Sequence, residues 1–322
     1  MNAIDRDFDA EAPVAPRLSR LQESWRLLKS NKLACIGLIF FVLFFCVATA
    51  GLTLTSGSKP VFDPALVRLQ EKLRPPLSKP NLETLLPEEI PALRIYLFGT
   101  DDLGRDVFAR MLQGAWVSLT VGFVAVGISV FIGIFMGGIA GYFGQHSPFI
   151  DTLVMRFVDI MLCFPSFFLI LTVVALLPAS MYNIMIVIGL TSWMGTTRFV
   201  RAEFLSLREQ DFVTAARALG LNHARIIFRH MIPNAIAPVL VSATIGIATA
   251  ILTEAGLSFL GFGVPPPDAT WGNILASGKD FIFDAPWLTF IPGFAILIVV
   301  LSFNLFGEGL RDIMNPKLRE RY

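Results

Sequence analysis

The feature that most constrains this chain is a set of long segments without charged side chains. Residues 33–55, 111–150, 160–197, 231–253 and 285–307 contain no Asp, Glu, Lys or Arg. A membrane-spanning helix needs about 20 predominantly apolar residues to cross the hydrocarbon core of a bilayer. These segments therefore predict a protein that crosses a membrane several times.

The segment 160–197 is too long for one spanning helix. Pro178, Ser180 and Asn183 favour turns and are expected to divide it into two. The sequence thus predicts an all-α polytopic membrane protein with six spanning helices. We expect them at residues 33–55, 116–142, 152–177, 182–203, 235–260 and 286–308.

The composition excludes several other classes of protein. Of 322 residues, 54% are hydrophobic and 16% are charged, whereas about 25% of residues in a soluble domain are charged. A disordered chain, a disulfide scaffold and a free nucleic-acid-binding protein are excluded, and membrane lipid is the expected surrounding. Cys35, Cys46 and Cys163 lie in apolar segments, where neither a disulfide framework nor a metal site is expected.

The positions of Lys and Arg predict the orientation in the membrane. Basic residues concentrate in segment 1–32, in residues 198–229 and in segment 311–322. With six spans, these three regions share one side, so we expect both termini to be cytoplasmic. The loop 56–115, in which acidic and basic residues are nearly balanced, is expected outside, and residues 116–310 form the expected five-helix core.

The expected cytoplasmic segment 204–233 contains signals for two helices around a glycine corner. Asp211 is expected to cap a short helix that ends at Gly220, a residue suited to a left-handed backbone. A second helix is expected to start at Asn222 and to end before Pro233. The arrangement predicts a rigid knob that projects into the cytoplasm.

The first of these helices has a slim surface that a partner can approach closely. The small and the flanking apolar residues are Ala215, Ala216, Ala218, Phe212, Leu219 and Phe228. The alternative is an ordinary amphipathic helix at the membrane surface, which composition alone favours.

Four motifs resemble those of a known family. Residues 211–220, DFVTAARALG, followed by Ile232 and Pro233, resemble the cytoplasmic EAA loop of ABC importer permeases. Thr214, His230 and Ile232 depart from the general motif but resemble the dipeptide and oligopeptide branch. Three further motifs support that branch: FGTDDLGRD at 98–106, LSFLGFGVPP at 257–266 followed by Trp271 and Gly272, and NLFGEGLRD at 304–312.

This resemblance implies the type I ABC importer permease fold and a subunit of an ATP-driven peptide importer in a bacterial inner membrane. The implied partners are a second homologous permease, two ATP-binding subunits, an external solute-binding protein and a peptide ligand. ATP and Mg belong to the ATPase subunits, so this chain is expected to hold no cofactor and to be no enzyme. The residues implied in coupling to the ATPase are Asp211, Ala215, Ala216, Gly220 and Pro233.

The stretch before the second span crowds charges between two glycines. We interpret it as an external structural corner, with a docking surface as the alternative, and it lacks the ligands of a calcium loop. The residues of this corner are Gly99, Thr100, Asp101, Gly104, Arg105 and Asp106.

Glu254 lies inside the fifth predicted span, where an ionisable side chain is costly. A role in the transport pathway and a structural hydrogen bond are both consistent with this position. A secondary transporter without ATPase partners would need paired repeats and broken helices around a site at the middle of the membrane. Glu254 is the only residue in the sequence that hints at such a transporter. A non-transporting membrane scaffold, with the knob as its binding module, is the third alternative.

No catalytic or metal-binding set is recognisable. Residues 272–280 approximate a phosphate-binding loop but have the wrong glycine spacing and lack its Ser or Thr. Near His146, His223 and His230, the sequence contains no residues at the spacing of a metal site or a catalytic triad. Two other patterns have structural interpretations. Gly133, Gly137 and Gly141 predict close helix packing, and Arg156 and Asp159 predict a pair on one helix face.

Overall fold

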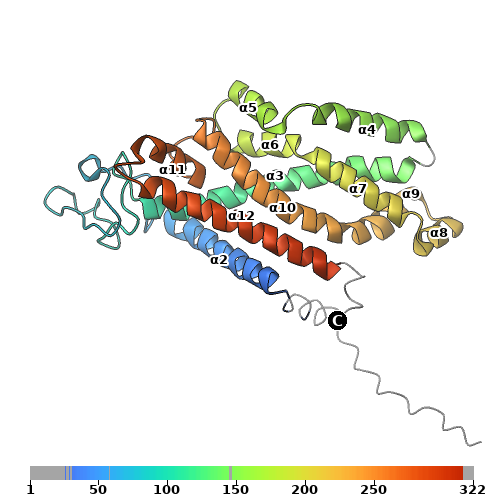
Figure 1. The fold of residues 1–322 in the computed structure, drawn as a ribbon, viewed down its shortest axis with the longest axis horizontal. Coiled ribbons are helices and arrows are strands. Elements are labelled where there is room, and N and C mark those ends of the chain that lie inside the picture. The colour runs from blue at the N-terminus through green and yellow to red at the C-terminus, as the bar shows by residue number, and fades with distance from the viewer. Residues whose placement is uncertain (1–25, 27–28, 30, 58, 145–146, 315–322) are drawn as a thin grey trace, which may run out of the picture.

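The computed structural model describes residues 26, 29, 31–57, 59–144 and 147–314. Most of the predicted segment 1–32 and of the tail 311–322 therefore lies outside the described residues. The described part is a bundle of helices (Figure 1). Its longer helices are α2 (Lys32–Thr55), α3 (Val107–Phe143), α4 (Pro148–Leu162), α5 (Ser166–Leu176), α6 (Met181–Thr191), α7 (Trp193–Leu207), α10 (Ile232–Phe259) and α12 (Trp287–Met314).

Shorter helices connect them. They are α8 (Asp211–Ala218), α9 (His223–Ile226), a π-helical turn (Ile227–Met231), α11 (Trp271–Gly278) and single 3-10 turns at Leu69–Glu71 and Lys279–Phe281. Helix α9, the π turn and α10 run on as one apolar helix, His223–Phe259, which we call the long helix 223–259.

The all-helical membrane architecture is confirmed. Helices α2, α3 and α12 and the long helix 223–259 are each long and apolar enough to cross a membrane, and the bent pair α4 and α5 makes a fifth candidate. Helices α6 and α7 meet at Ser192 and occupy the fourth predicted span. The count of six is roughly consistent with this arrangement.

Two predicted spans differ from the structure. The second begins at Val107 rather than at residue 116, because the Asp106 carboxylate accepts a hydrogen bond from Phe108 N–H at 2.9 Å and caps the helix there. The third is not one straight helix, since α4 and α5 are bent by 80°. Pro165 is the reason: it has no N–H to donate and disfavours helical backbone at Phe164.

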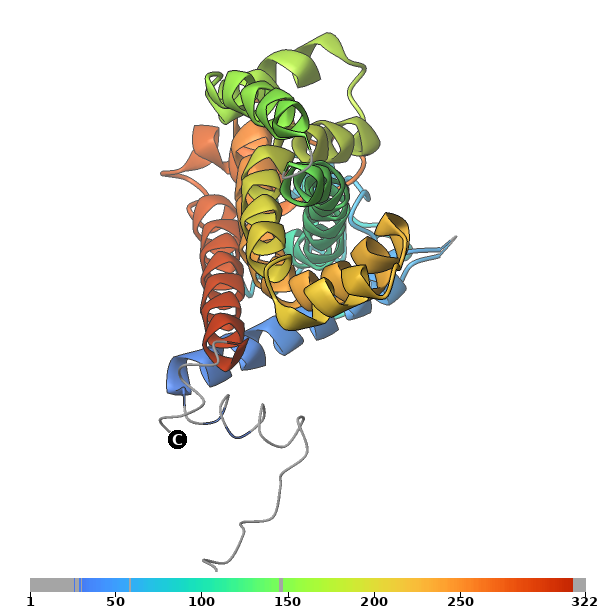
Figure 2. The same cartoon turned by 90° about the vertical axis from the view of Figure 1, so that its right-hand side faces the viewer.

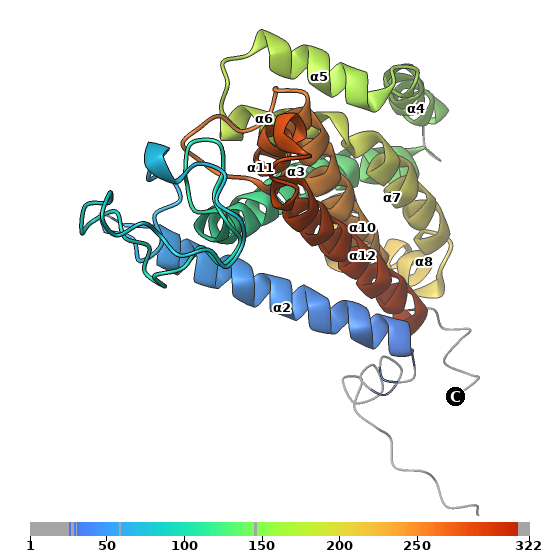
Figure 3. The same cartoon turned by 60° about the vertical axis from the view of Figure 1, so that its left-hand side comes forward.

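Helix α3 lies at the centre of the bundle and contacts α2, α6, α7 and α10 (Figure 2). Helices α4 and α5 cover the side opposite to α2 (Figure 3). The predicted close packing at Gly133, Gly137 and Gly141 is confirmed: a Cβ at each would lie 2.5–2.6 Å from an atom of α7.

The two ends of the bundle are different. The segment before α3 folds into turns beside α11 at one end, and α8 and α9 project from the other end (Figure 1). The two regions with the most distinctive sequence motifs are therefore separated by the full length of the helices.

Candidate functional site

The knob, defined as residues 208–231, joins α7 to α10. Helix α8 starts at Asp211, and the capping position is Gln210, whose side chain makes no capping hydrogen bond. The prediction that Asp211 caps the helix is therefore wrong. As the first helical residue, Asp211 instead places its negative charge near the positive end of the helix dipole.

Gly220 forms the predicted corner. Its φ is +72°, and its N–H donates to the carbonyl oxygen of Arg217 at 2.9 Å. A Cβ at this position would meet nothing within 4 Å, so the backbone conformation alone favours glycine here. The Asn222 side chain then accepts a hydrogen bond from Arg225 N–H at 2.8 Å and caps α9.

The second helix of the knob does not end before Pro233, contrary to the prediction. The π turn continues into α10, and Ile232 N–H donates to the carbonyl oxygen of Ile227. Pro233 lies inside this continuous helix and has no N–H to donate to the preceding turn, and it comes directly after the π turn, where the regular i→i−4 pattern is already interrupted. Consequently, the knob is joined to a membrane-spanning helix without a break.

The surface of the knob differs in part from the prediction. Ala216 is buried in an apolar cluster with Tyr142 and Phe204, so it holds the knob to α3 and α7 rather than facing a partner. Ala215 is exposed. Leu219, at 81% exposure, is a large apolar side chain that projects outward, and Phe228 and Phe212 are exposed as well.

Sequence reasoning missed the contact that seats the knob on the bundle. The Tyr142 hydroxyl and the His223 Nδ1 atom are 2.8 Å apart, and the Arg217 guanidinium lies 5.5 Å from the centre of the Tyr142 ring. Tyr142 and His223 are 81 residues apart, so no local pattern indicates that they meet.

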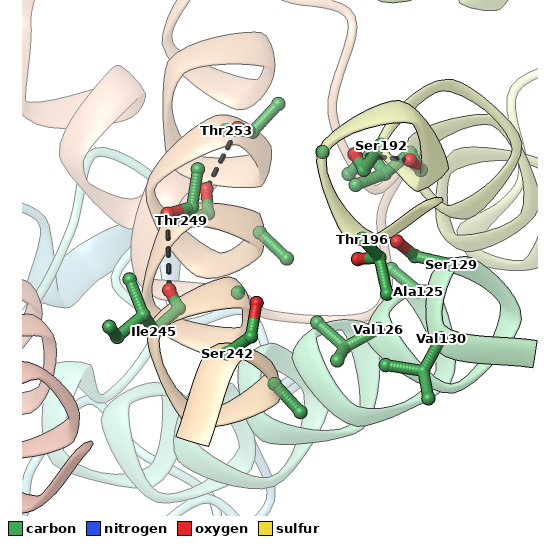
Figure 4. Close-up of a pocket in the computed structure, with 15 residues that line it drawn as sticks. Ala125, Val126, Ser129, Val130, Ser192, Thr196, Ser242, Ile245, Thr249 and Thr253 are labelled. Carbon is green, nitrogen blue, oxygen red and sulfur yellow. Dashed lines mark hydrogen bonds between the residues drawn. The ribbon is translucent and has the colours of Figure 1, made fainter. Parts of the chain in front are cut away.

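A pocket of about 250 Å³ lies among α3, α6, α7 and α10 (Figure 4). Its lining contains no charged side chain. The hydroxyl groups on its wall belong to Ser129, Ser192, Thr196, Ser242, Thr249 and Thr253. Such a surface can exchange hydrogen bonds with amide groups without attracting or repelling a charge.

Glu254 is fully buried but is not part of this pocket. Its Oε1 accepts a hydrogen bond from the Ser258 hydroxyl at 2.6 Å. Helix α11 packs beside it, since a Cβ at Gly272 would be 2.8 Å from the Ser258 Cβ. The structure thus shows a hydrogen bond within α10, while the Oε2 atom of Glu254 is buried without a hydrogen-bond partner among the described residues.

At the other end of the bundle, Asp101 organises the stretch before α3. It is 1% exposed, and its Oδ2 accepts hydrogen bonds at 2.7 Å from both Arg105 and Arg110. Arg110 also donates to the Asn273 side chain of α11 at 3.2 Å. Gly104, with φ +72°, is required here because a Cβ would lie 1.8 Å from the carbonyl oxygen of Arg68.

The remaining residues of this stretch are tied to the preceding loop. Thr100 donates its hydroxyl to the carbonyl oxygen of Glu71 and accepts Arg74 N–H at 2.8 Å. Gly99 has φ +79°. Burial raises the pKa of Asp106 above its usual value, against the hydrogen bond from Phe108. In the described residues, no three His, Cys, Asp or Glu side chains group as a metal ion would need.

Comparison with known proteins supplies two family matches. Residues 103–320 match the family described as "Binding-protein-dependent transport system inner membrane component". Residues 19–76 match the "N-terminal TM domain of oligopeptide transport permease C". Together they cover the knob and the pocket, whereas residues 77–102, which include Gly99, Thr100 and Asp101, lie between the two matches.

Similar whole chains carry related descriptions. The dipeptide transport system permease protein DppC of Alkalihalophilus pseudofirmus is 42% identical, over 94% of this chain and 91% of its own length. The oligopeptide transport system permease protein OppC of Bacillus subtilis is 36% identical, over 97% of this chain and 94% of its own length. In fold, the chain is similar to a subunit in inward-facing structures of the MetNI methionine ABC transporter, with a TM-score of 0.52, 18% identity and coverage of 65% and 98%.

Proposed function

The chain belongs to the family of binding-protein-dependent transport system inner membrane components, and on that basis we propose that it is a permease subunit of an ATP-driven importer for dipeptides or oligopeptides. Relatives at 36–42% identity along most of the chain are dipeptide and oligopeptide transport permeases. Glutathione-like compounds and nickel chelates are the alternative ligands.

The observation that carries the proposal is the continuity between knob and pocket. Helix α7 contributes Thr196 to the pocket and leads directly into the knob. The long helix 223–259 starts in the knob and contributes Ser242, Thr249 and Thr253 to the pocket. A displacement of the knob is therefore carried to two walls of the pocket by uninterrupted helices.

This geometry suits transport driven by a partner. ATP-dependent closure of two ATPase subunits would push on the knob through its exposed apolar side chains, and hydrolysis would reset it. The work comes from the different affinities of the two states for ATP, so ATP and Mg stay in the partners. A second permease would complete the pathway, and an external solute-binding protein would deliver the ligand.

Reconstitution tests the proposal. We expect this chain, purified alone in liposomes, to show neither ATP hydrolysis nor uptake of radiolabelled dialanine. Co-expressed with a second permease and the ATPase subunits, it should co-purify with them and import dialanine when ATP and the binding protein are supplied. Uptake by this chain alone, driven by an ion gradient, would instead indicate a secondary transporter.

A further inference from the structure

Helix α7 connects the pocket directly to the knob, yet its own chain does not fix its orientation. The break at Ser192 separates α7 from α6, and Ser192 N–H bonds back to Gly189 at 3.4 Å. Rotation of α7 about its axis must therefore be limited by the helices packed beside it.

Helix α3 supplies one of these supports. A Cβ at Gly137 would lie 3.0 Å from the backbone nitrogen of Arg201, and a Cβ at Gly141 would lie 2.9 Å from its carbonyl oxygen. This contact allows close approach, and the directional bond made beside it is a long one, from Arg208 Nη1 at the end of α7 to the Gly141 carbonyl oxygen at 3.3 Å. The contact limits the separation of the helices more than their relative rotation.

Helix α4 supplies the second support, through ion pairs. Arg201 Nε and Nη2 donate to the two carboxylate oxygens of Asp151 at 2.5 and 2.6 Å. Arg198 Nη2 donates to Asp159 Oδ1 at 2.6 Å. The earlier arginine pairs with the later aspartate, so α4 and α7 run antiparallel, as their ribbons do in Figure 1. The two ion pairs join the helices at two levels.

The two pairs are unequal. The side chains of Arg201 and Asp151 are 29% and 24% exposed, whereas those of Arg198 and Asp159 are 52% and 43% exposed. A two-pronged, partly buried guanidinium–carboxylate pair is strong and directional, while an exposed pair contributes little. The Arg201–Asp151 pair is therefore the main tie.

We infer that Arg201 and Asp151 are a positioning pair that locks α7 against α4, so that displacement of the knob reaches the pocket instead of being lost as rotation of α7. This inference rests on the proposed function. It assigns both residues to coupling, although neither lies in the knob or the pocket.

The test uses the complete transporter in liposomes, with radiolabelled dialanine. Arg201→Ala and Asp151→Ala are compared with the double charge swap Asp151→Arg with Arg201→Asp. Arg156→Ala is the matched control, because Arg156 also lies on α4 but is 77% exposed and 3.9 Å from Asp159. The measurements are the amount of ATPase subunit bound to the permease and the number of ATP hydrolysed per dialanine imported.

We expect each single variant to bind the ATPase subunits normally and to use about tenfold more ATP per dialanine, a factor typical of coupling between sites. The charge swap should recover most of the wild-type ratio, and Arg156→Ala should keep it. An unchanged ratio in the single variants, or a loss of ATPase binding that parallels the loss of uptake, would overturn the inference. A wild-type assembly that fails to import dialanine would count against the proposed function instead.

Discussion

Gly137 of α3 lies directly against the Thr197 backbone of α7, so that a Cβ at position 137 would be only 2.5 Å from the Thr197 carbonyl oxygen. Backbone atoms cannot yield as the end of a flexible side chain can. The contact sets the distance between the central helix and the helix that leads into the knob.

The first prediction follows from this contact. Gly137→Leu should destabilise the protein by at least the 1–3 kcal/mol typical of overpacking, because α3 and α7 must separate. Gly127→Leu on the same helix is the control, since a Cβ there meets nothing within 4 Å. The loss of stability would be measured as a lower midpoint temperature of thermal unfolding in detergent. Equal midpoint temperatures for the two variants would contradict the packing argument.

The second prediction concerns the corner of the knob. Gly220→Val should strain the left-handed backbone by about 1–3 kcal/mol and reduce both ATPase binding and peptide uptake, while membrane insertion stays normal. Gly57→Val is the control, because Gly57 has φ +107° and equally open space but lies in the loop before α3. Normal uptake with Val at 220 would show that the knob is not the coupling element.

The third prediction concerns Tyr96, whose ring is fully buried and whose hydroxyl has no hydrogen-bond partner in the described part of the chain. A buried hydroxyl without a partner costs about 1–3 kcal/mol, so Tyr96→Phe should unfold at the same temperature as wild type or higher. The contact with the Arg68 guanidinium, 6.0 Å from the ring centre, is retained.

The same residue has a testable pH dependence. Burial raises the pKa of Tyr96 from 10.0 to about 12. Because the ionised form is disfavoured in the folded protein, wild-type stability should fall as the pH rises through this interval, and the Phe variant should lose less. If the free energy of unfolding fell equally in the two proteins from pH 9 to 12, this prediction would be refuted.

The fourth prediction is the orientation in the membrane. After Cys35, Cys46 and Cys163 are replaced, single cysteines at Leu219 and Leu82, both exposed, can be labelled in intact cells by an impermeant reagent. The basic residues at the knob end predict labelling at position 82 and protection at position 219. The reverse result would invert the topology and separate the knob from cytoplasmic ATPases.

The features that the sequence determined by itself are local ones. A hydrocarbon layer requires an uninterrupted apolar helix, so the uncharged segments reveal the spans. Gly220 acts through its own positive φ, and Asn222 accepts a hydrogen bond from Arg225 N–H three residues later, so both effects are local and were predictable. The spacing of Gly133, Gly137 and Gly141 predicts a close helix contact, although the sequence does not identify the helix that they contact.

The tertiary structure decided whatever depends on neighbours distant in sequence. The hydroxyl-lined pocket combines residues of four helices, none of which is unusual in its own segment. Arg201 pairs with Asp151, which lies 50 positions away in the sequence. Glu254 is buried beside Ser258, its neighbour on α10, and beside α11, which comes later in the chain. The continuity through Pro233 includes a π turn, Ile227–Met231, and buried residues of the knob pack against Tyr142 of α3 and Phe204 of α7. Such a turn depends on packing and cannot be predicted from local helix propensity.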